Sequence, residues 1–392
     1  MTANPGPGLY LHLPFCSSIC PYCDFYVLTG DPARQRRFVD TLIAEISLCT
    51  GGRWPVVGAE SPVEPFDTLY LGGGTPSILA AEELTRTLEA LHRALPIDDD
   101  CWISLEANPE DVIPANLDAW RQLGVCFLSL GVQSFQQQNL DFLGRRHTAE
   151  QSHRSLELAL GAGFHTVSAD LIYGLPDQSR EDWQHDLELA LALGPQHLSC
   201  YQLTFHHGTP FGFRKERGEL AELPEEAQAE LFLLTHRFLA EKAFEGYEVS
   251  NFATGPEHRS CHNQKYWDHT PYLGLGPSAH SFAGHHRWWN RRKIKPWETR
   301  LEDGESPVES SEHLSPTDLA FERLILALRT ADGLDLESFR SVYGVDLLSA
   351  NLEVADRLQV DGLIRVDSGC LVPTTRGLAI ADTLARSFDI TE

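Results

Sequence analysis

Residues 8 to about 205 alternate short apolar runs with amphipathic stretches, and this alternation constrains the fold more than any other feature of the chain. The apolar runs predict strands and the stretches between them predict helices. Because right-handed crossovers join such strands into a parallel sheet, six units predict an α/β fold with a partial (β/α)6 barrel. The predicted strands span 8–13, 68–71, 101–105, 126–130, 167–172 and 198–203, and the predicted helices 33–49, 80–94, 114–123, 136–143, 149–162 and 180–193.

The pattern changes after the sixth unit. Residues 291–316 lose hydrophobic periodicity and gather charge, which predicts a linker, and residues 51–66, rich in Gly, Pro and Glu, predict an exposed loop. Three helical patterns, a small hairpin and a last helix follow the linker, as in a mostly helical, winged-helix-like domain. We therefore predict a barrel over 1–215, a barrel extension over 216–300 and a C-terminal domain over 316–392.

The charge balance excludes some classes of partner. Basic residues number 31 and acidic residues 56, for a net charge of −25, and such a surface repels nucleic-acid phosphates. No apolar run reaches the roughly 20 residues that span a bilayer, and the N-terminus does not resemble a signal peptide. We expect a cytoplasmic protein with no nucleic-acid partner and no integral membrane segment.

Three of the nine cysteines lie within eight residues, at the end of the first predicted strand. Cys16, Cys20 and Cys23 are spaced so that three thiolates can hold one face of an iron–sulfur cluster. No fourth cysteine is nearby, so one iron would stay open for an external ligand. The alternative is a zinc site completed by His12, although the spacing differs from that of paired zinc knuckles.

Polar or Gly-rich turns follow the predicted strands, and in barrels these turns meet at one mouth. Residues 72–74 are three consecutive glycines, whose backbone N–H groups could approach a ligand closely. Glu106 and Asp170 lie at or just before the ends of apolar strands, where an unpaired carboxylate is costly. Ribose hydroxyls or a cationic ligand would explain both carboxylates, and a salt bridge with Arg145 or Arg146 is the simpler alternative.

These motifs resemble those of the radical S-adenosylmethionine (SAM) superfamily. Within it, they are similar to the oxygen-independent coproporphyrinogen III oxidase-like group, and in that group to the HemW heme chaperones. The resemblance covers nearly the whole chain. Its motifs are YLHLPFC (10–16), LGGGTPS (71–77), GVQS (131–134), LGRRH (143–147), DLIYGLP (170–176) and HNQKYW (262–267).

The resemblance implies the cofactors and the function. Cys16, Cys20 and Cys23 would hold a [4Fe–4S] cluster whose open iron binds SAM. The protein would bind heme and deliver it to an acceptor protein, and a homodimer is expected from the family alone. The positions matching the SAM contacts of the family are Tyr10, Gly73, Gly74, Thr75, Glu106, Gln133, Arg145 and Asp170.

Two departures separate this chain from the oxidases. Phe25 occupies the place at which the oxidases have a further cysteine, and only nine residues precede Tyr10, whereas the oxidases have a longer N-terminal segment. Both features favour a heme chaperone over an oxidative decarboxylase of coproporphyrinogen III. A third alternative, a radical SAM enzyme that modifies heme, stays open.

The heme ligand is the least determined of these predictions. His262 precedes two aromatic residues and matches the motif of the chaperones, so it is the leading candidate for the axial ligand. The alternative is a core histidine packed beside Tyr266 and Trp267. Further candidates are Cys261, His206, His207, His285 and His286, and Trp288 with Trp289 would form either an apolar patch or part of the core.

Overall fold

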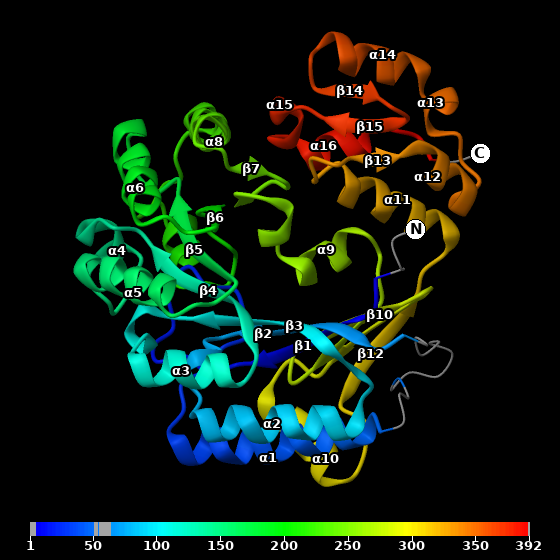
Figure 1. Ribbon diagram of the computed structural model, residues 1–392. Helices are drawn as coiled ribbons and strands as arrows, with labels where there is room; N and C mark the ends of the chain where they lie inside the picture. The colour runs from blue at the N-terminus through cyan, green and yellow to red at the C-terminus, as the bar shows by residue number, and fades with distance from the viewer. Residues whose placement is uncertain (1–4, 51–53, 55–63, 391–392) are drawn as a thin grey trace.

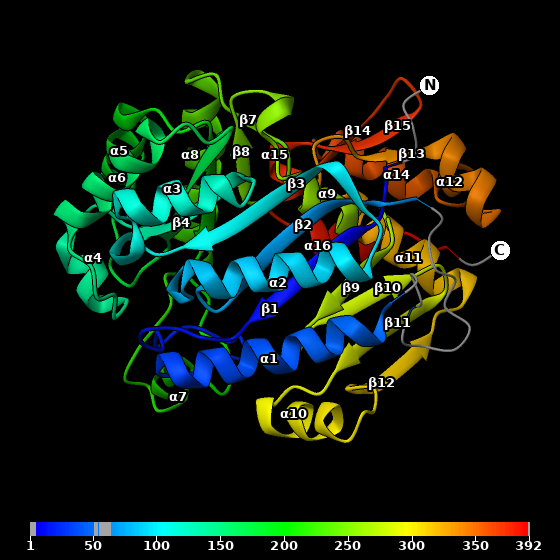
Figure 2. The same cartoon turned by 60° about the horizontal axis from the view of Figure 1, so that its bottom comes forward.

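A computed structural model of the chain describes residues 5–50, 54 and 64–390, and a sheet of 12 strands organises most of this part. Six central strands run parallel in chain order, with helices on their outer side (Figures 1 and 2). The predicted partial (β/α)6 barrel is confirmed. Its elements are β1 (Gly8–Leu13), α1 (Pro32–Leu48), β2 (Phe66–Gly73), α2 (Ala81–Ala94), β3 (Ile97–Ala107), α3 (Pro114–Gln122), β4 (Val125–Gln133), α4 (Gln137–Phe142), α5 (Ala149–Gly161), β5 (Thr166–Tyr173), α6 (Arg180–Leu193) and β6 (His197–Gln202).

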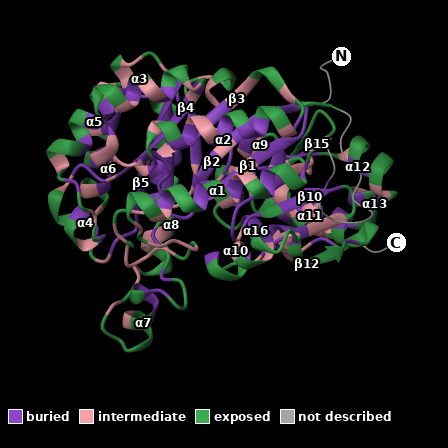
Figure 3. Ribbon diagram, turned by 90° about the horizontal axis from the view of Figure 1, so that it is seen from below, coloured by how far each residue is buried: buried purple, intermediate pink, exposed green. Residues whose placement is uncertain are grey.

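The two faces of the barrel strands differ in polarity. On β1, Leu9, Leu11 and Leu13 are buried in the main apolar core, while Tyr10 between them contacts Tyr70 of β2. This alternation follows from the two-residue period of a strand. Figure 3 shows the resulting concentration of buried residues in the sheet. The helix-facing side is therefore apolar, and the inner side is free to carry polar groups.

Additional strands extend the sheet at both ends. Strand β9 (Tyr272–Leu275) pairs with β1 in parallel, a pairing that was not predicted, and β10 (His280–Ala283), β11 (His286–Asn290) and β12 (Val308–His313) continue antiparallel. Beyond β6 lie β8 (Asn251–Ala253) and β7 (Glu245–Gly246). The intervening helices are α7 (Pro210–Glu216), α8 (Glu225–Glu241) and α9 (Cys261–Trp267).

The predicted linker over 291–316 is wrong. This segment forms α10 (Ile294–Glu302) and β12. Trp297 of α10 is fully buried, stacks on Phe38 of α1 with ring centroids 5.3 Å apart, and donates to the Glu45 carboxylate at 3.0 Å. The short helix is stabilised by this tertiary packing, which local periodicity does not reveal. Of the predicted loop over 51–66, all but residues 54 and 64–66 lie outside the described residues.

The C-terminal part has its own apolar cluster and is mostly helical, as predicted. Its sheet has three strands instead of the two of the predicted hairpin, because residues 334–335 pair with residues 370–371. Arg323 of this part donates to the carbonyl of Trp267 in α9 at 3.0 Å, and Asp332 pairs with Arg259, just before α9, at 3.0 Å. In the part of the chain that the structure describes, no helix is both long and apolar enough to cross a membrane. The elements are α11 (Pro316–Ala327), β13 (Leu334–Asp335), α12 (Leu336–Tyr343), α13 (Leu347–Ala350), α14 (Leu352–Val360), β14 (Ile364–Asp367), β15 (Cys370–Pro373), α15 (Thr375–Leu378) and α16 (Ala381–Arg386).

Candidate functional site

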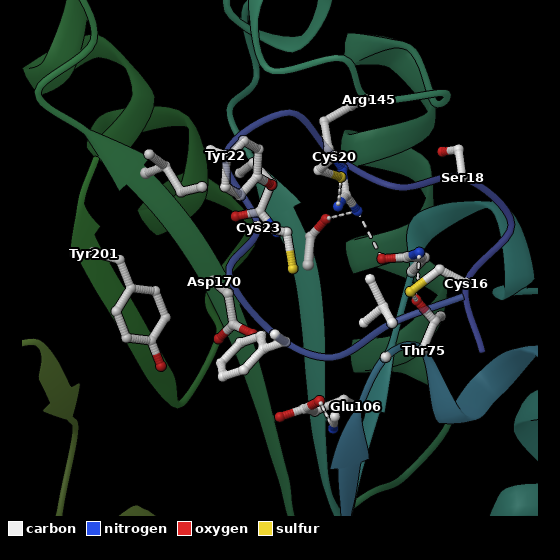
Figure 4. Close-up of a pocket in the computed structure, with 18 of the residues that line it drawn as sticks. Cys16, Ser18, Cys20, Tyr22, Cys23, Thr75, Glu106, Arg145, Asp170 and Tyr201 are labelled. Atoms are coloured by element: carbon white, nitrogen blue, oxygen red, sulfur yellow. Dashed lines mark hydrogen bonds between the residues drawn. The ribbon is translucent and has the colours of Figure 1, made fainter. Parts of the chain in front are cut away.

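A cavity of about 430 Å³ lies at the carboxyl ends of the barrel strands. Its wall is formed by the loop after β1 and by the ends of β2 to β6, and Figure 4 shows side chains from these elements facing one another. Most of the residues singled out from the sequence meet here. They are Cys16, Cys20, Cys23, Gly73, Gly74, Thr75, Glu106, Gln133, Arg145 and Asp170.

The three clustered cysteines are free thiols in the loop after β1. This loop is closed at its base, where Cys16 N donates to the Leu28 carbonyl at 2.9 Å. The hydroxyl of Thr75 lies 3.5 Å from the Cys16 sulfur. Burial raises the pKa of Cys16 above its usual value and that of Cys23 to about 11. Without a bound metal, both thiols are therefore protonated near neutral pH, as expected of groups that ionise on binding iron.

The donor set fits a cluster better than a single metal ion. No three His, Cys, Asp or Glu side chains of the described residues gather closely enough to hold one ion, whereas a cubane cluster binds each thiolate through a different iron. His12 does not complete a zinc site, because its ring nitrogens bond the Tyr10 hydroxyl at 3.1 Å and the Tyr26 carbonyl at 2.9 Å. Cys16, Cys20 and Cys23 are the only cysteines of the described chain that line the cavity.

The consecutive glycines at the end of β2 are explained by crowding within the chain. Gly73 has φ +105°, and a Cβ there would lie 2.5 Å from the His12 ring. A Cβ on Gly74 would lie 2.6 Å from the Phe15 carbonyl oxygen. The close approach of this turn to the β1 loop thus requires glycine even without a ligand. Gly73 N also donates to Glu106 at 3.1 Å.

Glu106 and Asp170 face the cavity from β3 and β5. Burial, with a contribution from Asp170, raises the pKa of Glu106 to about 7, although the Tyr70 hydroxyl donates to it at 2.8 Å. Burial likewise raises the pKa of Asp170 to about 6, and the Ser129 hydroxyl donates to it at 2.7 Å. Neither carboxylate forms an ion pair with an arginine among the described residues. Both are therefore available to a ligand in the cavity.

Arg145 and Gln133 complete the polar wall. Arg145 donates to Asn108 Oδ1 at 2.6 Å, to the Gly131 carbonyl at 3.0 Å and to the Cys20 sulfur at 3.5 Å. Gln133 ends β4 with φ +66°, a left-handed conformation that is rare for residues other than glycine. Such conformations concentrate at functional sites, because surrounding contacts must hold them.

Tyr10 and His262 are not brought to the cavity. His262 lies beside Thr68, near the start of β2 and thus at the opposite end of the barrel. It is fully buried, and its ring nitrogens bond the Thr68 hydroxyl at 3.0 Å and the Tyr266 hydroxyl at 2.8 Å. Burial lowers the pKa of His262 to about 3. This is the geometry of a core histidine, and in this conformation neither nitrogen is available to heme iron.

The remaining heme candidates differ in their surroundings. The His207 ring donates to the Glu216 carboxylate at 2.6 Å and the His285 ring bonds the Leu314 carbonyl at 3.1 Å, and neither histidine lines the cavity. Trp288 is buried against Trp54, with ring centroids 5.2 Å apart. His206, in contrast, lines the cavity.

Several cavity residues were missed from the sequence. Tyr201 and Gln202 end β6, and the rule that barrel ligands lie at strand ends would have identified both. Asn108 follows β3, and only its bond to Arg145 reveals that it supports the wall. Phe25, noted as a departure from the oxidases, lies in the wall with 66% of its surface exposed.

Comparison with curated relatives shows the family of this chain, and a solved structure shows its fold. The model of the radical SAM superfamily matches residues 10–190, and that of the HemN C-terminal domain matches residues 314–380. The heme chaperone HemW of Mycobacterium tuberculosis is 34% identical over 97% of this chain and 94% of its own, and that of Escherichia coli is 31% identical over 91% of each. The solved structure of the E. coli coproporphyrinogen III oxidase HemN, a radical SAM enzyme, superposes with a TM-score of 0.82 at 23% identity, covering 98% of this chain and 90% of that one.

Proposed function

The chain belongs to the HemW family of the radical SAM superfamily, and from this premise we propose that it is a heme chaperone. It binds a [4Fe–4S] cluster, SAM and heme, and it passes heme to an acceptor protein. One observation carries the proposal: three thiols and the polar residues expected around SAM line a single cavity. The barrel fold alone does not require these groups to meet in one cavity, so their meeting there supports a binding site.

In this proposal, Cys16, Cys20 and Cys23 hold the cluster. When bound and reduced, a cluster of this kind supplies an electron and an open iron site to SAM. The chain contributes the surroundings. Arg145 places a fixed cation 3.5 Å from the Cys20 sulfur. Thr75 places a neutral hydroxyl beside the Cys16 sulfur.

The rest of the cavity would orient SAM. Glu106 and Asp170 present carboxylate oxygens that can accept from ribose hydroxyls and attract a sulfonium. Gln133 adds an amide at the end of β4, and the turn over Gly73 and Gly74 brings backbone close to the β1 loop. The chain thereby supplies both charge and hydrogen bonds to one face of the ligand.

The alternative function is oxidative decarboxylation of coproporphyrinogen III. It is less well supported, because Phe25 stands where the oxidases have a cysteine. The likeness to the HemN structure, at 23% identity, bears on fold alone. An assay for protoporphyrinogen separates the two functions.

The first test concerns the cluster. After anaerobic reconstitution, iron and sulfide per chain should fall to background in Cys16→Ser, Cys20→Ser and Cys23→Ser. Cys370→Ser is the matched control, because Cys370 belongs to β15 of the C-terminal part and does not line the cavity. Full iron content in the three variants would contradict the site.

The second test concerns the activity. In the first experiment, reconstituted protein is incubated with SAM, a reductant and coproporphyrinogen III. In the second experiment, the protein is loaded with heme and mixed with a heme protein from which heme has been removed. We expect that chromatography detects no protoporphyrinogen in the first experiment. In the second, we expect heme to pass to the acceptor protein. Product formation by protein with an intact cluster would reject the chaperone function in favour of the oxidase.

A further inference from the structure

His206 is the histidine that lines the cavity, and no other does so among the described residues. It lies between β6 and α7, with 48% of its side chain exposed. None of the described residues forms a hydrogen bond with either ring nitrogen, whereas Asp24 Oδ2 lies 3.8 Å from Nε2. His206 is therefore an imidazole at the cavity whose nitrogens are not used by the fold.

The backbone of His206 is held firmly although its ring is exposed. The hydroxyl of Thr209 donates to the His206 carbonyl at 2.7 Å, and Thr209 N does so at 3.2 Å. Gly212 packs against the same carbonyl so closely that a Cβ there would lie 2.0 Å from it. Phe211 N donates to the Pro21 carbonyl at 2.9 Å, which ties α7 to the loop of the cysteines. A ligand on this ring would thus meet a preorganised position.

Two aromatic side chains beside the cavity are exposed. Phe25 is 66% exposed and Tyr201 is 44% exposed, and both line the same cavity as His206. Figure 4 shows Tyr201 across the cavity from Cys16 and Thr75. Large exposed apolar groups at a concave site mark a surface that binds an apolar partner. A flat aromatic macrocycle suits two such rings better than a polar ligand does.

Side chains of both charges also line the cavity. Arg146 is exposed there, and a guanidinium pairs well with a carboxylate. Asp24 faces the His206 ring, as carboxylates commonly face histidines that bind metals. An imidazole, two apolar rings and a cation together match the iron, the macrocycle and the propionates of heme.

We infer that heme docks at the mouth of the cavity, with His206 as its axial ligand, Phe25 and Tyr201 against the macrocycle, and Arg146 near a propionate. This inference rests on the proposed function and states where its heme binds. It places heme at the cysteine end of the barrel. His262 of α9, at the other end, keeps its structural bonds to Thr68 and Tyr266.

The test is a titration of cluster-reconstituted full-length protein with ferric heme, followed by difference absorption spectra and electron paramagnetic resonance. Wild type should show a histidine-ligated heme. His206→Ala should lose that signature and bind heme at least about tenfold more weakly, and added imidazole should restore the signature. His207→Ala is the matched control, because His207 is the adjacent residue, is 86% exposed and does not line the cavity.

Phe25→Ala adds an independent measurement. It should weaken heme binding while the histidine signature stays, because it removes a contact with the macrocycle and not the iron ligand. Iron content of each variant, measured before titration, shows that the fold and the cluster site are intact. His206→Ala with wild-type spectra and affinity, in a protein whose wild type binds heme, would overturn this inference alone. A wild type that binds no heme would overturn the proposed function as well.

Discussion

The guanidinium of Arg145 lies 3.5 Å from the sulfur of Cys20, although 125 positions separate them in the chain. The same side chain bonds Asn108 Oδ1 and the Gly131 carbonyl. One cation therefore joins the cysteine loop to the ends of β3 and β4. Its neighbours Tyr22 and Cys20 raise the pKa of Arg145 against the opposing effect of burial, so it stays charged.

Arg145→Met should weaken both ligands of the cavity. The variant removes a cation beside Cys20 and leaves the Asn108 and Gly131 oxygens without their donor. We expect lower iron content after reconstitution and SAM binding at least about tenfold weaker by equilibrium dialysis. Arg154→Met, at an exposed arginine of α5 that does not line the cavity, is the control for SAM. Equal SAM affinity in wild type and Arg145→Met would contradict the role assigned to Arg145.

SAM binding should strengthen as pH rises through the pKa values of the cavity carboxyls. Burial raises these values to about 6 for Asp170 and about 7 for Glu106, so both groups lose charge below them. A neutral carboxyl no longer attracts a sulfonium, and affinity should fall by up to about tenfold per pH unit for each protonated group. Glu106→Gln should remove the change in SAM affinity near pH 7, because that change belongs to Glu106. Titration of SAM itself affects wild type and Glu106→Gln equally, so the difference between their pH profiles reports on Glu106. Parallel pH profiles of SAM affinity in the two proteins would refute the prediction.

His262 should stabilise the fold, and the effect should depend on pH. Its pKa is about 3 in the folded chain because of burial, against an ordinary value of 6.5. The stabilisation by the neutral ring is thus complete above pH 6.5 and is lost as pH falls from 6.5 toward 3. His262→Gln should lower the free energy of unfolding by about 2 kcal/mol at pH 8. Urea unfolding at decreasing pH should show this difference shrinking, and a constant difference would argue against a buried neutral ring. His207→Gln, at an exposed position, is the control.

Glu45 of α1 should be essential to the stability of the packing between α1 and the segment that follows β9. Its carboxylate accepts from Gly276 N at 2.8 Å, Asn290 Nδ2 at 2.6 Å and Trp297 Nε1 at 3.0 Å. Glu45→Ala leaves three buried donors without an acceptor, so we expect a loss of about 3 kcal/mol in the free energy of unfolding. Glu241→Ala, on an exposed helix end, should change it by less than about 0.5 kcal/mol. A similar small change for Glu45→Ala would show that water replaces the carboxylate.

The order and type of the elements over residues 8–205 could be predicted from sequence, because strand and helix periods are local properties of the chain. The cysteine spacing is local too, and by itself it indicates a site with three thiolates. Strand polarity is equally local, so the residue pattern alone places Glu106 next to the end of β3 and Asp170 in the second half of β5. The convergence of the strand ends follows from the general geometry of a parallel barrel.

Other features depend on partners distant in the chain. Local sequence does not distinguish α10 from a linker, because its stability comes from Trp297 packing on Phe38 and bonding Glu45. The availability of a histidine is also decided by tertiary structure. His262 has both nitrogens bonded by Thr68 and Tyr266, while the His206 ring is bonded by none of the described residues. Residue type and spacing thus determined which chemistry this chain carries, whereas three-dimensional contacts decided which groups are used by the fold and which stay free for ligands.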